Sequence, residues 1–295
     1  MNEPNLYVVT TDFDGWQQTR SCLQNLESST YTDFATIVVD HGTTDETATG
    51  LKAFPACVHL RGAPELWWAG ATNLGIRAAL DRGASHIMLL NNDCYVDALT
   101  LTEVMSKFSE VRMKVVAPVQ RDLKSGAVLV ARASTCFTLG FPSLMLPNMR
   151  SLPATDDSLL PTGLIVGGRG AVIPASVFEL VGLFDEKALP HYGADHDFYL
   201  RCRAKGVPLY LATRANVSID GTRTTVATGL GDMTWPQFKA SLRDRRSHRN
   251  IDALRTLFRR YYPVKLLYPL GLSLNLGRYF TSYIVQRLVS WFGRG

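Results

Sequence analysis

Short apolar runs alternate with segments of helical spacing through the first 120 residues. Five of the runs are rich in β-forming residues and end in polar residues, which is typical of strands. The segments between them place apolar side chains three or four positions apart, which is typical of helices. The expected strands and helices, in chain order, are residues 6–11, 15–28, 35–40, 44–54, 57–62, 69–83, 86–93, 97–108 and 114–120. This alternation predicts an α/β fold with right-handed βαβ units and a mostly parallel central sheet with helices on both faces.

The second half of the chain is less regular. Residues 194–206 predict a helix, with acids in the first turn and basic residues in the last turn before a glycine. The other expected elements are antiparallel strands at 127–134 and 134–141, a loop over 142–162, a glycine-rich strand region at 163–174 and short strands at 208–213 and 216–220. No internal repeat is visible.

Polar side chains gather where the predicted parallel strands end. The ends of the first, second and fourth strands carry Asp12, Asp14, Asp40 and the run Asn91–Asp93. In sheets of this kind ligands bind at the carboxyl ends of the strands. We therefore expect a binding site, rich in carboxylates, along this edge of the sheet.

The segment LLNNDCYVD, residues 89–97, contains the most informative of these acids. A carboxylate at the open end of a strand, here Asp93, can bind a divalent cation that bridges two phosphate oxygens. A solvated turn is an equally good interpretation of the segment alone, because Asn and Asp favour turns. Asp97 is expected to begin the next helix.

Two other acidic segments are candidates for the same site. Asp40 ends a strand, where its carboxylate can accept hydrogen bonds from a ribose or a base; the alternative is a loop that caps the next helix at Thr44 and Asp45. Asp195 and Asp197 lie in the first turn of a predicted helix, where the macrodipole favours the ionised carboxylate that a general base needs. For an isolated helix, ordinary N-terminal charge is the preferred interpretation.

Several function classes are disfavoured by the motifs that the chain lacks. No GxxxxGK[ST] segment occurs, and the glycine-rich segments are not placed as in a dinucleotide-binding fold. The five cysteines form no CxxC pair and the histidines form no HExxH motif, which argues against a thiolate zinc site and favours a reducing compartment. The N-terminus has no basic and apolar signal segment, so a cytoplasmic location is expected.

Charge is divided unevenly along the chain, whose net charge is +5. Residues 239–295 contain twelve Lys and Arg against two Asp, whereas residues 1–238 contain 19 basic and 24 acidic residues. The basic tail interleaves Arg with Leu, Phe and Tyr, and residues 278–292 place apolar side chains along one side of a helix. This pattern favours an interfacial helix on an anionic membrane surface. Packing or homo-oligomerisation is the main alternative, and a nucleic-acid patch is the least favoured.

Six segments, in this order, resemble the family 2 glycosyltransferases with the GT-A fold, particularly the bacterial rhamnosyltransferase-like branch. They are YVVTTDFD, IVVDHGTTDET, ELWWAGATNLGIRAAL, HIMLLNNDCYVD, GGRGAVIPASVFELVGLFDE and GADHDFYLRCRAKG. The resemblance covers roughly residues 4–220. It implies a GT-A domain over residues 1–235 and, beyond it, a basic amphipathic helical appendage over residues 236–295.

The resemblance also implies roles for individual residues. Asp195 matches the family's catalytic base, although Ala194 stands where a Glu is usual. Asp93 matches the metal ligand of the DxD-type motif, in which Asn91 occupies the first position. Asp220 lies near a position where many members carry a metal-binding His. The implied donor-binding residues are Thr10, Asp12, Asp40, Asn73 and Asn92.

The function implied is inverting transfer of a sugar from dTDP-rhamnose or a UDP-hexose, with Mg²⁺ or Mn²⁺, to a hydroxyl of a glycan or polyprenyl-linked acceptor. The expected setting is cell-surface polysaccharide (lipopolysaccharide) synthesis on the inner face of the cytoplasmic membrane, with no nucleic-acid partner. A non-catalytic relative that binds sugar nucleotides and a nucleotidyltransferase on a related fold are the alternatives. The acidic loop after the first strand, TTDFDGW, argues against the nucleotidyltransferase.

Overall fold

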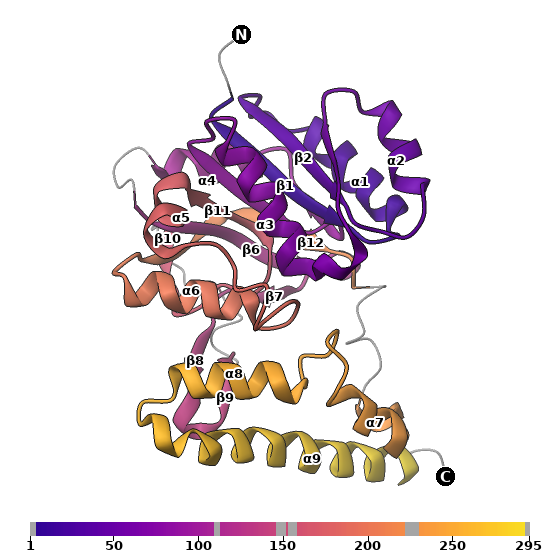
Figure 1. The fold of residues 1–295 in the computed structure, drawn as a ribbon, viewed down its shortest axis with the longest axis vertical. Helices are drawn as coiled ribbons and strands as arrows, with labels where there is room; N and C mark the ends of the chain where they lie inside the picture. The colour runs from indigo at the N-terminus through magenta and orange to yellow at the C-terminus, as the bar shows by residue number, and fades with distance from the viewer. Residues whose placement is uncertain (1–3, 109–112, 146–151, 153–157, 222–229, 293–295) are drawn as a thin grey trace.

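The computed structural model describes residues 4–108, 113–145, 152, 158–221 and 230–292. It contains a large sheet with helices on both faces and a layer of C-terminal helices below (Figure 1). The strands of the large sheet are β1 (Leu6–Asp12), β2 (Phe34–Asp40), β3 (Val58–Arg61), β4 (His86–Leu90), β5 (Cys94–Val96), β6 (Val115–Asp122), β7 (Val128–Val130), β10 (Leu159–Pro161), β11 (Arg169–Pro174) and β12 (Leu209–Ile219). The helices are α1 (Trp16–Glu27), α2 (Glu46–Gly50), α3 (Trp67–Leu80), α4 (Thr100–Met105), α5 (Ala175–Val181), α6 (Ala194–Ala204), α7 (Trp235–Ser241), α8 (Ile251–Tyr261) and α9 (Tyr268–Phe292).

The predicted α/β fold with a mostly parallel sheet is confirmed. The strand order is β10-β12-β6-β11-β4-β1-β2-β3, and β3, β2, β1 and β4 run parallel to one another. All seven residues of β1 are buried, because one face meets α3 and the other meets α1. A continuous apolar strand is therefore what a sheet covered on both faces requires. Helix α3 packs closely on β1, since a Cβ at Gly75 would lie 2.4 Å from a methyl of Val9.

The second half of the sheet departs from the simple βαβ pattern. Strand β11 lies between β4 and β6 and runs antiparallel to both. The two short strands expected at 208–213 and 216–220 are one continuous strand, β12, with a register shift between Ala212 and Asn216. The expected loop over 142–162 contains the end of β9 (Phe141–Leu144) and all of β10 in its described parts. The helix expected over 44–54 is α2 followed by a 3₁₀ turn.

The C-terminal helices α7, α8 and α9 form a separate layer, to which a hairpin from the middle of the chain also belongs (Figure 1). The hairpin consists of β8 (Ser134–Cys136) and β9, and it lies against α8 and α9. Asn275 of α9 donates a hydrogen bond to the carbonyl of Gly140 at 2.9 Å. Phe137 packs edge-on against Phe258 of α8, with ring centroids 5.2 Å apart. The predicted helical appendage is thus present, and it is anchored by residues far from it in sequence.

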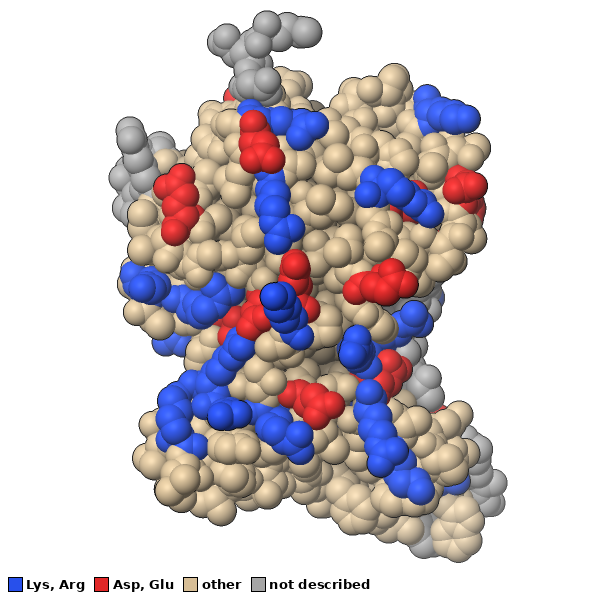
Figure 2. All heavy atoms as spheres, in the orientation of Figure 1, with Lys and Arg blue, Asp and Glu red and all other residues tan. Residues whose placement is uncertain are grey.

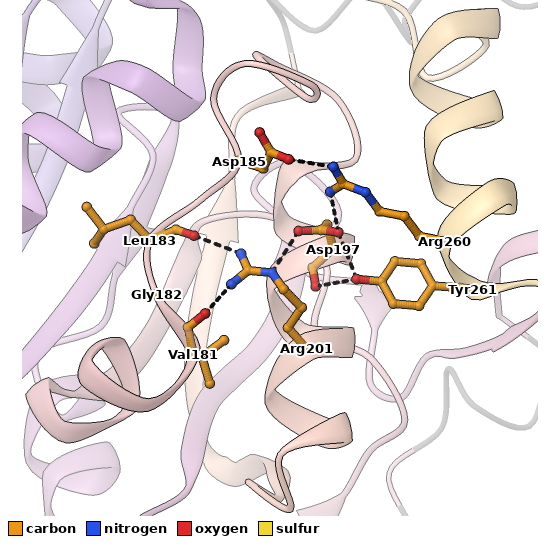
Figure 3. A pocket seen from close by; sticks show the side chains of 8 residues that line it. All are labelled: Val181, Gly182, Leu183, Asp185, Asp197, Arg201, Arg260 and Tyr261. Carbon is orange, nitrogen blue, oxygen red and sulfur yellow. Dashed lines mark hydrogen bonds and ion pairs between the residues drawn. The ribbon is translucent and has the colours of Figure 1, made fainter.

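An ion-pair cluster fixes the appendage to the sheet domain (Figure 3). The Asp197 carboxylate, on α6 and fully buried, accepts hydrogen bonds from Arg201 at 2.9 Å, from Arg260 at 2.8 Å and from Tyr261 Oη at 2.7 Å. Arg260 also binds Asp185 at 2.5 Å. Asp197, the second acid of the segment ADHD, therefore joins α6 to α8 through these hydrogen bonds.

Candidate functional site

A cavity of about 580 Å³ opens at the carboxyl ends of β1 and β4, beside the start of β11 and the N-terminus of α6. Its lining is aromatic and charged. The aromatic and histidine side chains are Phe13, Trp67, Trp68, Tyr192, His41, His191 and His196. The charged side chains are Glu65, Asp93, Arg169, Asp195 and Arg246. Of the predicted site residues that the structure describes, Asn92, Asp93 and Asp195 line this cavity.

Asp12 lies behind the cavity wall and holds Asn92 in place. Its buried carboxylate accepts hydrogen bonds from Asn92 Nδ2 at 2.7 Å, from Thr19 Oγ1 at 2.7 Å and from the Gly15 N–H at 3.1 Å, as well as from Thr47. The Asp12 carboxylate is thus engaged within the protein, and its role in donor binding stays a prediction. Its neighbour Thr10 is also buried, and its hydroxyl has no hydrogen-bond partner among the described residues.

Asp40 and Asn73 are also engaged within the protein. Asp40 is fully buried and accepts hydrogen bonds from Arg61 Nη1 at 2.5 Å and from the Gly42 N–H at 3.1 Å, so it shapes the loop after β2. Asn73 donates to the Phe184 carbonyl at 2.9 Å and accepts from the Phe184 N–H at 3.0 Å. It therefore ties α3 to the segment before α6. The roles of both residues in donor binding stay predictions.

Asp93 faces the cavity from the end of β4, near a second acid. Burial raises the pKa of Asp93, the Arg169 guanidinium opposes that rise, and the charge of Asp220 adds to it. The N–H of Asp220 donates to the Asp93 carbonyl at 2.8 Å, so the ends of β4 and β12 meet here. The neighbouring Asn91 accepts a hydrogen bond from Trp68 Nε1 at 2.9 Å.

Asp195 enters the cavity from the first turn of α6. Its Oδ2 accepts a hydrogen bond from the Gly167 N–H at 2.7 Å, and its Oδ1 lies 3.0 Å from His196 Nδ1. Burial raises the pKa of Asp195, but the His196 charge and these hydrogen bonds outweigh it and lower the pKa to about 2. The turn before α6 needs Gly193, whose φ of 86° is costly for any residue with a Cβ. Asp195 is therefore an ionised carboxylate at neutral pH.

Several cavity residues were not expected from the sequence, among them Trp67, Arg169 and Arg246. Trp67 begins α3 with a φ of 52°, a strained value for a bulky side chain. The Arg246 guanidinium, from the segment between α7 and α8, lies 5.9 Å from the Trp67 ring centroid and 5.7 Å from that of Phe13. Arg169, at the start of β11, lies beside Asp93. The adjacent tryptophans and the GGRG segment are their sequence signals, but nothing local shows that Arg246 reaches the cavity.

Comparison with protein families identifies the class of protein. The model described as Glycosyl transferase family 2 matches residues 7–179, which is more than half of the chain. The chain belongs to glycosyl transferase family 2. The family and the GT-A fold expected from the sequence are confirmed, while the rhamnosyltransferase-like branch stays a prediction.

The curated relatives of this family 2 chain are uncharacterized proteins of mycobacteria. Rv1525 of Mycobacterium tuberculosis and Mb1552 of Mycobacterium bovis are each 31% identical to it over 165 residues. The match covers 54% of this chain and 56% of each relative, so the chain spans about half the length of the curated relatives it matches.

Solved GT-A enzymes share the fold. GalNAc-T7 with UDP, GalNAc and Mn²⁺ has a TM-score of 0.61 and 14% identity, and covers 91% of this chain and 59% of its own. The mannosyltransferase PcManGT from Pyrobaculum calidifontis, in complex with GDP-Man and Mn²⁺, has a TM-score of 0.59 and 14% identity, and covers 100% of this chain and 77% of its own. A TarS fragment from S. aureus has a TM-score of 0.55 and 11% identity, and covers 94% and 72%. At these identities the likeness concerns the fold alone.

The acids of the family 2 site are compatible with a divalent cation. Among the described residues no group of three His, Cys, Asp or Glu side chains could enclose a metal ion. Mg²⁺ nevertheless binds through one or two carboxylates plus substrate phosphates and water. Asp93 and Asp220 supply two such carboxylates at adjacent strand ends, where β4 meets β12. Their chemistry fits a cation that is completed by a phosphorylated substrate.

Proposed function

We propose that this chain is an inverting glycosyltransferase that moves a sugar from a nucleotide diphosphate sugar to a hydroxyl group. The observation that carries the proposal is that Asp93 and Asp195 line one cavity at the carboxyl ends of the strands. One acid lies beside Asp220 and Arg169, and the other is ionised at the N-terminus of α6. Family 2 membership and the shared fold of enzymes solved with UDP or GDP-Man support the same reaction class.

The reaction is a single displacement at the anomeric carbon, and different residues assist different parts of it. The acceptor oxygen attacks the anomeric carbon, the bond from that carbon to the diphosphate oxygen breaks, and the nucleoside diphosphate leaves. Asp195 drives removal of the proton from the acceptor hydroxyl, a contribution of about 10²–10⁴-fold. Asp93 and Asp220 would hold Mg²⁺ or Mn²⁺. When bound, this cation would offset the negative charge on the leaving diphosphate.

For the donor and acceptor we propose dTDP-rhamnose or a UDP-hexose, and a glycan or polyprenyl-linked hydroxyl in cell-surface polysaccharide synthesis. The resemblance of the six sequence segments to the rhamnosyltransferase-like branch supports this choice. Lipopolysaccharide is the glycan class that we expect.

We further propose that the enzyme works on the inner face of the cytoplasmic membrane, bound through the C-terminal helices. Among the described helices none is both long and apolar enough to cross a bilayer. Helix α9 instead exposes a row of apolar side chains along its length. They are Leu270, Leu274, Phe280, Ile284, Val285, Leu288, Val289 and Trp291. Figure 2 shows Lys and Arg side chains over the lower half of the molecule, above a largely uncharged lower edge formed by α9.

The reaction is tested by measuring nucleoside diphosphate release with a panel of UDP, dTDP and GDP sugars, candidate acceptors and Mn²⁺. We expect release with one donor class, and Asp195→Asn should keep donor affinity while removing most of the turnover. Retention of more than about a tenth of wild-type activity in Asp195→Asn would contradict its role. A wild-type protein that binds a donor but never releases diphosphate would be a non-catalytic relative.

A further inference from the structure

His196 forms a close pair with Asp195 inside the cavity. The two residues are consecutive in the first turn of α6, and His196 Nδ1 lies 3.0 Å from Asp195 Oδ1. Their side chains are only 16% and 13% exposed, respectively, and both line the cavity. The pair is therefore held away from bulk water at the place where an acceptor hydroxyl has to lose its proton.

The other ring nitrogen of His196 is available. Among the described residues no group hydrogen-bonds to His196 Nε2. Nε2 is also absent from the fully buried atoms that lack a partner. If Nδ1–H donates to Asp195, the neutral ring carries its lone pair on Nε2. The carboxylate thus selects the tautomer that can accept a proton from the cavity.

The acid–base properties of the two residues favour the imidazole as the final proton acceptor. Within the pair the proton belongs to the imidazole, because the His196 charge and the hydrogen bonds to Asp195 lower the pKa of the Asp195 carboxyl. Burial lowers the pKa of His196, but the Asp195 charge and hydrogen bond outweigh it and raise the pKa above its ordinary 6.5. General-base catalysis is most efficient when the pKa of the base lies near the working pH.

We propose that Asp195 and His196 act as a catalytic dyad in which Nε2 of His196 accepts the proton of the acceptor hydroxyl. This inference rests on the proposed glycosyl transfer. As the acceptor O–H bond breaks, an N–H bond forms at Nε2 and the oxygen bonds to the anomeric carbon, while the electron pair of the broken sugar–phosphate bond leaves with the nucleoside diphosphate. Asp195 positions the ring and stabilises the imidazolium, which later releases its proton to solvent.

The other histidines and tyrosines around the pair have pKa values that are shifted away from neutral pH, so they are poorer proton acceptors there than His196. Burial, with the nearby charge of Arg246, lowers the pKa of His191 to about 4, and burial also lowers the pKa of His41. Burial raises the pKa of Tyr192 and of Tyr199. The remaining charged groups that line the cavity are Glu65, Asp93, Arg169 and Arg246.

The first experiment compares pH–rate profiles of the wild type, His196→Asn and a control variant, His86→Asn. His86 lies on β4, and its ring contacts that of Phe108. Because Nε2 must be neutral, wild-type turnover should fall as the pH drops through the raised pKa of His196. In His196→Asn we expect kcat to fall by about 10²–10⁴-fold, with donor KM nearly unchanged and the acidic limb lost. A His196→Asn protein with more than about a tenth of wild-type kcat and an unchanged profile would overturn the dyad.

The second experiment follows the His196 ring by ¹⁵N NMR in the free protein, with folding of each variant checked by thermal unfolding. We expect Nδ1 to stay protonated and the pKa of His196 to drop in Asp195→Asn, because the stabilising charge is removed. The same pKa in both proteins would overturn the pairing. This measurement needs no donor, so it tests the dyad separately: if the wild type turns over no sugar nucleotide, the proposed reaction fails whatever the titration shows.

Discussion

Asp12 and Asp93 both stand at the end of a strand in the sheet, but their side chains have different surroundings. Asp12 is completely buried and its oxygens are engaged by neighbouring hydroxyl, amide and backbone donors. Asp93 lines the cavity, with Arg169 and Asp220 nearby. The difference lies in which donors surround each carboxylate. Those donors come from distant segments, so the residue type alone does not separate an acid engaged within the protein from one that lines the cavity.

We predict that Asp12→Ala lowers the free energy of unfolding by about 3–5 kcal/mol. The substitution leaves buried donors of Thr19, Thr47 and Asn92 without a partner, and each unsatisfied buried group costs about 1–3 kcal/mol. Urea unfolding followed by circular dichroism measures the change. Asp81→Ala, at the exposed end of α3, is the control and should stay within about 0.5 kcal/mol of wild type. A similar small change in both variants would contradict the structural role of Asp12.

We predict that Asp93→Asn removes metal-dependent nucleotide binding. In the wild type with Mn²⁺, UDP or dTDP at a concentration about 100 times the Kd of the nucleotide should stabilise the fold by about 2.7 kcal/mol. EDTA should abolish part of the resulting shift in Tm. The neutral amide that this substitution introduces is a weaker ligand than a carboxylate, so the EDTA-sensitive part should disappear. Asp97→Asn, on the exposed residue four positions later, should retain it. An EDTA-sensitive shift of wild-type size in Asp93→Asn would rule out Asp93 as the ligand.

At the scale of secondary-structure elements, the sequence predicts what is local and misses what is not. The strands 6–11 and 86–93 were expected within a few residues, because their apolar runs are continuous and end in polar residues. The antiparallel insertion of β11 between β4 and β6 was not, since it depends on pairing over about 80 positions rather than on the composition of β11. Of the residues that line the cavity, Asn92 and Asp93 were predicted at the end of a strand and Asp195 was predicted in the first turn of a helix.

The contribution of the α7–α8 segment to the cavity gives a prediction at this scale. Arg246 lines the cavity over Phe13 and Trp67, whereas Arg245 contacts Trp67 but is not part of the lining. Arg246→Ala should therefore weaken binding of UDP or dTDP about tenfold, the loss of one charge-assisted hydrogen bond. Calorimetry should show unchanged affinity for uridine or thymidine, and Arg245→Ala should bind like wild type. An equal loss for nucleoside and diphosphate would instead indicate that Arg246 stacks on the base.

At the scale of the whole molecule, the C-terminal appendage packs against the sheet domain on one side and exposes apolar side chains on the other. Its buried side carries Arg260 and Tyr261, which hydrogen-bond to Asp197 on α6 (Figure 3). The same appendage carries Arg246, which lines the cavity. Its other side exposes the apolar row of α9. Residues 253–295 contain no acidic side chain, so nothing on this part of the sequence repels an anionic surface. An anionic bilayer therefore satisfies both the charge of the tail and the exposed apolar face, whereas a second basic copy satisfies only the latter.

We predict that the protein floats with vesicles that contain anionic lipid and not with purely zwitterionic vesicles at low salt. The double variant Leu274→Glu, Leu288→Glu should stay at the bottom of the gradient, because it places charges on side chains that are 54% and 49% exposed on α9. Leu180→Glu, on α5 and 41% exposed, is the matched control and should float like wild type. Raising the salt concentration should weaken binding, since the attraction between the basic tail and the lipid headgroups is screened. Absence of flotation, together with a dimer in light scattering that the double variant abolishes, would show that the α9 face joins two copies of the chain instead.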